Sequence, residues 1–173
     1  MIQGKVTTEL VSDRHGEVGS RQVVAFERAV VSEDEAGARH LGRSYWIVVE
    51  QSTHGIVRRV REAGGASDLR LLGRGPSLLK LGPAQLHVRS GRVTCRYSIL
   101  GGILARRAGG VLTFDQWHDG GALVSSTVTG FHPSLGRRVG LPAWSGVLYA
   151  QLQARLHHLI GRRWLLHLTG TTR

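Results

Sequence analysis

Cysteine is almost absent from this sequence: Cys95 is the only one in 173 residues. A single cysteine excludes an internal disulfide and is compatible with a reducing compartment. Long apolar runs are missing too, since no segment approaches the roughly 20 residues of a membrane-spanning helix. The first ten residues lack the charged-then-apolar pattern of a secretory signal. We therefore expect a cytoplasmic protein with no membrane partner.

Lysine and aromatic residues are also scarce. Lys5 and Lys80 are the only lysines, so arginine supplies almost all of the basic side chains behind the formal net charge of +11. The arginines are scattered along the chain, in part as doublets such as Arg58–Arg59 and Arg137–Arg138, and aromatics make up only 6%. A nucleic-acid-binding surface is usually clustered and interleaved with stacking aromatics. We therefore favour solvated arginines around an acidic or carboxylate-bearing small ligand over a nucleic-acid partner.

The motifs of common cofactor and metal sites are missing as well. The sequence contains no Walker loop, GxGxxG, HExxH, CxxC or GxSxG motif. One cysteine and scattered histidines disfavour a structural zinc site. The adjacent His157 and His158 would point about 100° apart on a helix, so they cannot chelate one ion together. We expect no metal and no cofactor.

The length of 173 residues suits a single domain with a real core, and no linker or repeat divides the chain. We expect strands over about residues 2–131, interrupted by a short helix at Glu33–Leu41. Ser32 and Glu35 have the spacing of a capping box for that helix, and Gly42 would follow its last turn.

The segment Tyr45–Gln51, YWIVVEQ, has the strongest β-propensity of the chain. We predict a strand there. A helix continuing to Glu62 is the alternative, but it would have to absorb Gly55 and many β-branched residues. Earlier strands are predicted at residues 2–11 and 21–31, although the spacing of Val23, Phe26 and Val30 in the second segment also fits a helix.

From Leu69 onward, short apolar runs alternate with turn signals, which is typical of an antiparallel meander. Ser90–Gly91 indicates a hairpin, and Gly101–Gly102 indicates a bulge or bend inside a strand-like run. The runs are LRLL (69–72), SLLKL (77–81), QLHVR (85–89), VTCRYSIL (93–100), ILARR (103–107), VLTFDQW (111–117) and ALVSSTVTGF (122–131).

Residues 143–168 are the only segment with sustained helical periodicity. A helix with one apolar face needs an apolar surface to cover, and the strands can supply it. We therefore predict an α+β fold: a curved antiparallel or barrel-like β-sheet wrapped on this C-terminal helix, with an internal cavity. At about 100° per residue, the leucines that form the apolar stripe are Leu148, Leu152, Leu156, Leu159 and Leu166, with Tyr149 and Ile160 at its shoulder.

A polar column, Gln151, Arg155, His158 and Arg162, lies beside the leucine stripe. Inside a cavity, the glutamine and arginines would bind an anionic or carbonyl group, and the histidine would transfer a proton. On a solvated helix edge the same side chains would have no such role. The sequence leaves both readings open.

The catalytic candidates are Glu50, Tyr97 and His158. Trp46 and Glu50 would share one face of the predicted strand. If that face points inward, Glu50 is a carboxylate with a raised pKa and a candidate acid or base; if it points outward, it is an ordinary surface residue. Tyr97, on the same face as Cys95, would direct its hydroxyl inward to a ligand or to a backbone carbonyl.

Further polar and aromatic residues complete the predicted ligand-binding set. Asp115 and Trp117 share one face of a later strand. His132, just before Pro133, lies in a strand-to-helix loop near the expected mouth of the cavity, where an ordinary loop histidine is the alternative. The predicted ligand-binding residues are Trp46, Asp115, Trp117, His132, Gln151 and Arg155.

The loop Gly130–Trp144, GFHPSLGRRVGLPAW, leads into the C-terminal helix and resembles the helix-grip arrangement of the START/Bet v1-like superfamily. That superfamily includes polyketide cyclases and lipid carriers. The resemblance covers about the second half of the chain. It implies two short helices after the first strand, where only Glu33–Leu41 is predicted here. A closed calycin-like barrel is the rival architecture.

Three functions are compatible with these patterns. The first is a cofactor-independent cyclase that folds a hydrophobic, polyketide-like substrate in the cavity, in natural-product biosynthesis, as the resemblance implies. The second is a non-catalytic carrier of such a ligand, which would bear a carboxylate or carbonyl group. The third is a basic nucleic-acid-binding β-domain. Whether the protein is an enzyme, and whether it forms a homodimer, the sequence leaves open.

Overall fold

A computed structural model describes residues 7–12, 18–105, 107–132 and 159–168 of the chain. Its strands form one antiparallel sheet in the order β1-β2-β9-β8-β7-β5-β4-β3, with β6 pairing with β7. No helix among the described residues is long and apolar enough to cross a membrane. The elements are β1 (Thr7–Ser12), β2 (Val18–Phe26), α1 (Glu35–Ser52), β3 (Val57–Arg61), the short 3-10 turn η1 (Ala63–Gly65), β4 (Ser67–Leu71), β5 (Ser77–Leu81), β6 (Gln85–Arg89), β7 (Arg92–Gly101), β8 (Val111–His118) and β9 (Ala122–Phe131).

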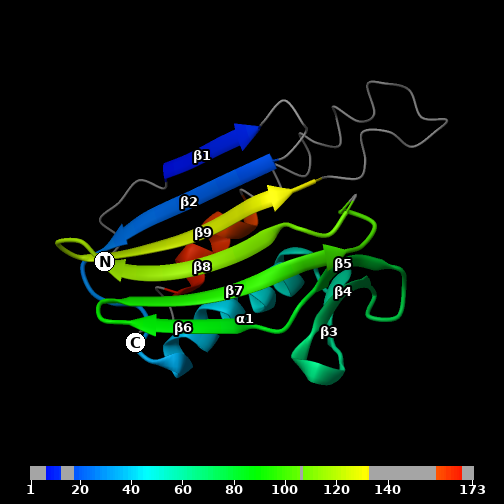
Figure 1. The fold of residues 1–173 in the computed structure, drawn as a ribbon, viewed down its shortest axis with the longest axis horizontal. Coiled ribbons are helices and arrows are strands. Elements are labelled where there is room, and N and C mark those ends of the chain that lie inside the picture. Colours follow the sequence, from blue (N-terminus) through cyan, green and yellow to red (C-terminus); the bar gives the residue numbers. More distant parts are fainter. Residues whose placement is uncertain (1–6, 13–17, 106, 133–158, 169–173) are drawn as a thin grey trace.

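Two helical segments cover one face of this curved sheet (Figure 1). Helix α1 and the helical residues 159–168 both lie behind the sheet in that view. We call the covered side the inner face. It carries Val24, Phe114 and Cys95, whose side chains are buried. The side toward the viewer is the outer face.

The sheet is open, because β1 and β3 are its two ends and do not pair with each other. The barrel-like alternative is therefore wrong, whereas the predicted α+β class with a curved antiparallel sheet and a C-terminal helix is confirmed. This arrangement is consistent with a helix-grip fold.

The strand predicted at Tyr45–Gln51 is wrong, because these residues belong to α1. Their β-branched and aromatic side chains favour a strand locally. Leu41, Tyr45 and Val48 are all buried, however, at the spacing of a helix that covers a sheet. Tertiary packing of this face outweighs local propensity, which differs by at most about 1 kcal/mol per residue.

The predicted helix start and end are also corrected. Asp34, not Ser32, is the N-cap: its carboxylate accepts a hydrogen bond from the Gly37 N–H at 2.7 Å, and the Ser32 hydroxyl donates to it at 2.7 Å. Gly42 does not end the helix but lies inside it. A Cβ there would approach the Cys95 sulfur to 2.6 Å, so this glycine lets α1 pack closely on β7.

The meander is largely as predicted. Six of the seven runs contribute to strands β4 to β9, and Gly91 forms the predicted tight turn with a positive φ of 71°. Gly101 and Gly102 also have positive φ and lie where the pairing between β5 and β7 shifts register. In the run predicted at 103–107, the described residues 103–105 and 107 do not form a strand. Instead Ile103 and Leu104 donate backbone hydrogen bonds to the carbonyls of Ser77 and Leu78.

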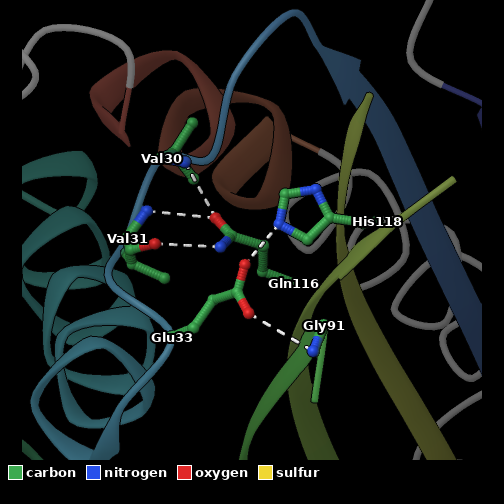
Figure 2. Close-up of polar contacts among 6 residues, drawn as sticks. All are labelled: Val30, Val31, Glu33, Gly91, Gln116 and His118. Atoms are coloured by element: carbon green, nitrogen blue, oxygen red, sulfur yellow. Dashed lines mark hydrogen bonds and ion pairs between the residues drawn. The ribbon is translucent and has the colours of Figure 1, made fainter. Parts of the chain in front are cut away.

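Gln116 fastens the segment between β2 and α1 to the sheet (Figure 2). Its Oε1 accepts hydrogen bonds from Val30 N at 2.8 Å and Val31 N at 3.0 Å, and its Nε2 donates to Val31 O at 2.9 Å. Beside it, Glu33 pairs with His118 at 2.6 Å and accepts from Gly91 N at 3.3 Å. These contacts fix where α1 begins.

The C-terminal helix presents a different face from the one predicted. Residues 159–168 are helical, as expected, but Leu159 and Leu166 of the leucine stripe are 46% and 49% exposed. The buried hydrophobic residues are Ile160, which was predicted at the shoulder of the stripe, and Trp164, Leu165 and Leu168. The face is set by Trp164, whose large ring fits the aromatic core. The rest of the predicted helix, residues 143–158, lies outside the described residues.

Candidate functional site

The inner face changes from apolar to polar along one level of the sheet. Strand pairing places Cys95 next to Phe114, Phe114 next to Ser126, and Ser126 next to Gln22, which pairs with Thr8. The residues of β7 and β8 on this level are apolar or weakly polar, and those of β9, β2 and β1 are polar. We call Thr8, Gln22 and Ser126 the polar row.

The polar row is buried but not satisfied. Gln22 is 1% exposed and Ser126 is 0% exposed. Gln22 Oε1, Ser126 Oγ and Thr8 Oγ1 have no hydrogen-bond partner within the described part of the chain. Each such orphaned group costs about 1–3 kcal/mol, and native structures contain few of them. Three on neighbouring strands indicate a place for a polar partner.

The C-terminal helix approaches this row closely. Gly161 is buried, and a Cβ at this position would overlap the side-chain amide of Gln22. Glycine is therefore required if the helix is to lie against β2 at this point. Trp164, one turn further on, contacts Phe114 with ring centroids 5.2 Å apart. The helix thus covers the boundary between the polar and the apolar parts of the inner face.

An aromatic cluster fills the apolar part beneath α1. The ring centroids of Trp46 and Tyr97 lie 5.5 Å apart, and those of Tyr45 and Phe114 lie 4.6 Å apart. Trp46 is 4% exposed, yet its indole N–H has no hydrogen-bond partner among the described residues. Packing by aromatic rings therefore occupies much of the space where a cavity was expected.

Arg59 brings the predicted residues Trp46, Glu50 and Tyr97 together. Its guanidinium carbon lies 5.6 Å from the ring centroids of both aromatic residues. Its backbone N–H donates to Glu50 Oε1 at 2.9 Å, and its Nε donates to Ser67 Oγ at 2.9 Å. Sequence reasoning missed Arg59 because a doublet of arginines in a strand does not show which one faces inward.

Trp46 and Glu50 do share a face, although the predicted strand is a helix. Residues four positions apart lie on the same side of a helix and also on the same side of a strand. Trp46 points into the aromatic cluster, and the half-buried Glu50 reaches β3 through its hydrogen bond to Arg59. Of the predicted catalytic residues, Glu50 and Tyr97 therefore lie in one neighbourhood.

Burial controls the protonation of the groups at the bottom of this cluster. It raises the pKa of the Tyr97 phenol and of the Cys95 thiol. At neutral pH, Tyr97 therefore keeps its proton and can donate a hydrogen bond to a carbonyl oxygen. Cys95 keeps its proton as well, which makes it a poor nucleophile.

Asp115 and Trp117 lie on the outer face, away from Phe114 and Gln116. The Asp115 carboxylate accepts hydrogen bonds from Thr94 Oγ1 at 2.6 Å and Arg92 Nη2 at 3.1 Å. The predicted shared face is correct, but the sheet separates these residues from Trp46 and Tyr97. They belong to a different surface from the polar row.

The remaining predicted residues are not joined to either group. His132, just beyond the end of β9, has its Nε2 2.9 Å from Arg107 Nη2. Arg162 is exposed, as a solvated helix edge would have it. Gln151, Arg155 and His158 lie outside the described residues. Across the described ranges there is no group of three His, Cys, Asp or Glu side chains that could hold a metal ion.

Comparisons with known proteins give weak matches. No protein-family model and no curated relative matches the chain. Among solved structures it is similar to protein Ms6760 from Mycobacterium smegmatis, at 12% identity and a TM-score of 0.45, over 98% of this chain and 100% of that one. Ara h 8.0201 is 16% identical with a TM-score of 0.38, over 93% and 99% of the two chains. CalU16 from Micromonospora echinospora is 9% identical with a TM-score of 0.37, over 95% and 98%. Likenesses of this degree establish neither family nor function.

Proposed function

We propose that this protein binds a hydrophobic small molecule carrying hydroxyl or carbonyl groups at the polar row of the inner face. The observation that carries the proposal is the set of unpaired, buried polar atoms on Thr8, Gln22 and Ser126. The two side-chain hydroxyls can donate to a ligand carbonyl, and a ligand hydroxyl can donate to Gln22 Oε1 once the amide turns away from Gly161. Each bond formed would remove a desolvation penalty that the free protein bears.

The neighbouring side chains favour a mostly apolar skeleton for this ligand. Phe114 flanks Ser126 on the next strand, and Val24 and Val124 form the adjacent level of the inner face. A polyketide-like chain or ring system combines such a skeleton with spaced oxygen atoms. Native mass spectrometry of purified protein, looking for a co-purifying small molecule, is the direct first experiment.

Neighbouring serines on β9 offer a matched pair for testing the proposal. Ser126 faces inward and Ser125 faces outward, and both are buried. Ser126→Ala should leave stability unchanged or raise it, because an unsatisfied hydroxyl is removed. It should weaken binding of an identified ligand, or of a polyphenol probe such as emodin, by about tenfold. Ser125→Ala should not change this affinity; equal loss in both variants would refute the polar row as the site.

A ring-forming cyclase is the finer form of this hypothesis. Tyr97 supports it, because a phenol that stays protonated at neutral pH can donate to a carbonyl oxygen as charge develops there. Glu50 would be the base in such a reaction. The packing of Tyr97 against Trp46 favours a carrier instead, since a substrate would have to displace these rings. Turnover of a polyketide-like substrate that Tyr97→Phe abolishes would establish the cyclase.

The polar column of the C-terminal helix can be tested in the same way. If Arg155 faces the ligand, Arg155→Met should lower affinity by about tenfold, the worth of one charge-assisted hydrogen bond. Unchanged affinity would assign this residue to the solvated edge of the helix.

A further inference from the structure

The outer face of β6 and β7 gathers the basic side chains of a single hairpin. Strand pairing places Arg89 directly opposite Arg92, His87 opposite Thr94, and Arg96 opposite Gln85. Arg89, Arg92 and Arg96 are all exposed. No described helix covers this side of the sheet, which faces the viewer in Figure 1.

Acidic residues are missing from β6 and β7 themselves, although Glu9 on β1 lies opposite Arg21. The chain contains no Asp or Glu between Asp68 and Asp115, a stretch that includes all of β5, β6 and β7. The arginines of β6 and β7 therefore have no carboxylate neighbour on their own strands. Like charges directly opposite each other, such as Arg89 and Arg92, destabilise an antiparallel pair. Asp115 on β8 pairs with Arg92, but among the described residues no carboxylate pairs with Arg89 or Arg96, which leaves these two guanidinium groups for an external anion.

The ring of Trp117 holds two of the arginine side chains on this face of the sheet. The guanidinium carbons of Arg21 and Arg92 lie 5.6 Å and 5.7 Å from the centroid of its ring. Asp115 holds Arg92 beside the ring, at 3.1 Å from Oδ1 to Nη2, and is itself fixed by the hydroxyl of Thr94. Since Asp115 is only 4% exposed, it orients the arginine without presenting its own charge to a partner.

We propose that Arg21, Arg89, Arg92, Arg96 and Trp117, here called the basic patch, bind single-stranded nucleic acid. Arginine forks bind phosphate oxygens bidentately, and both indole rings and guanidinium planes stack on unpaired bases. A duplex fits this patch less well, because the face of a sheet of many strands is too broad to enter the major groove as a helix or two-stranded β-ribbon does. The patch lies on the face opposite the polar row, so the proposal is independent of ligand binding there.

The test is fluorescence anisotropy with a fluorescein-labelled oligothymidylate of about 20 nucleotides, at several salt concentrations. The unsubstituted protein should bind with an affinity that falls steeply with salt. In the double variant Arg89→Gln/Arg96→Gln, affinity should drop at least tenfold, and the slope of log K against log salt should decrease by about 1.4, or 0.7 per lost phosphate contact. Trp117→Leu should weaken binding about fivefold or more through lost stacking.

A control of equal charge is available on α1. Arg39 and Arg43 are exposed on that helix, on the other side of the sheet, so Arg39→Gln/Arg43→Gln removes the same charge without touching the patch. This variant should bind the oligonucleotide within about twofold of the original protein. If the two double variants weaken oligonucleotide binding equally, the effect depends on net charge alone and the proposal is overturned. Absence of salt-dependent binding would overturn it too, as would binding of phosphatidylserine vesicles in preference to the oligonucleotide.

Discussion

The indole N–H of Trp164 donates a 2.8 Å hydrogen bond to the hydroxyl of Ser44, joining the C-terminal helix to α1 across 120 positions of sequence. Both residues are buried, at 0% and 2% exposure. The Ser44 hydroxyl in turn donates to the Leu41 carbonyl at 3.0 Å. This chain of bonds fixes the two helices relative to each other over the aromatic cluster.

Removing the Ser44 hydroxyl should therefore be costly. Ser44→Ala would leave the Trp164 N–H buried without a partner, and we expect a loss of about 1–3 kcal/mol in the free energy of unfolding. Urea denaturation measures this loss. Adding Trp164→Phe to Ser44→Ala should cost less than the sum of the two single changes, because the orphaned donor is removed. Strict additivity would mean that the bond does not join the helices.

Replacing Gly42 by alanine should change stability in the opposite direction from the same replacement in an unobstructed helix. In an unobstructed helix, replacing glycine by alanine stabilises by roughly 0.5–1 kcal/mol. Here a Cβ would come within 2.6 Å of Cys95 Sγ and 2.7 Å of Tyr97 Oη. We expect Gly42→Ala to destabilise by about 1–3 kcal/mol through overpacking. A stabilised variant in thermal or urea unfolding would show that α1 is not packed against β7 at this point.

Gln116 can be changed without changing its shape. Gln116→Glu keeps the acceptor for Val30 N and Val31 N but replaces the donor that faces Val31 O. Burial beside a carbonyl should raise the pKa of the new carboxyl above its unfolded value of about 4.3. The unfolded chain then releases its proton first, so stability should fall as pH rises above about 4.3. The variant should lose more stability relative to the original protein at pH 7 than at pH 5 in urea unfolding.

The buried tyrosines and Cys95 predict a loss of stability in alkali. Burial raises the pKa of Tyr45, Tyr97 and Cys95 in the folded state. Each group has a lower pKa in the unfolded chain than in the folded protein. At a pH between these two values the group is deprotonated in the unfolded chain but still protonated in the folded protein, so the free energy of unfolding falls as pH rises. The decline should begin near pH 8.5, where free cysteine titrates, and steepen near pH 10, by at most about 1.4 kcal/mol per pH unit and group.

Replacing Cys95 separates its contribution to the alkaline loss of stability from the contribution of the tyrosines. In Cys95→Ala, the decline should begin only near pH 10, where free tyrosine titrates. Unfolding free energies measured by urea denaturation from pH 7 to 11 would show the difference. A decline that starts at the same pH in both proteins would remove Cys95 as its cause.

The sequence by itself determined much of the sheet. Alternating apolar residues with glycine-marked turns, as at Ser90–Gly91, depend on local rules that hold in any context. The hairpin of β6 and β7 and the run of β9 from Ala122 to Phe131 therefore form as predicted. Shared faces were also predictable, because Trp46 and Glu50 coincide on a strand and on a helix alike.

Only the tertiary structure decided which helices and strands pack against one another. Residues 45–51 prefer a strand locally, yet burial against β7 makes them helical. The polar row appears only when β1, β2 and β9 are side by side, because Thr8, Gln22 and Ser126 are distant in sequence. Arg21 meets Arg92 over Trp117 for the same reason, whereas Arg89, Arg92 and Arg96 are neighbours on one hairpin. Strand pairing is set by the burial of the whole inner face, and no local pattern encodes it.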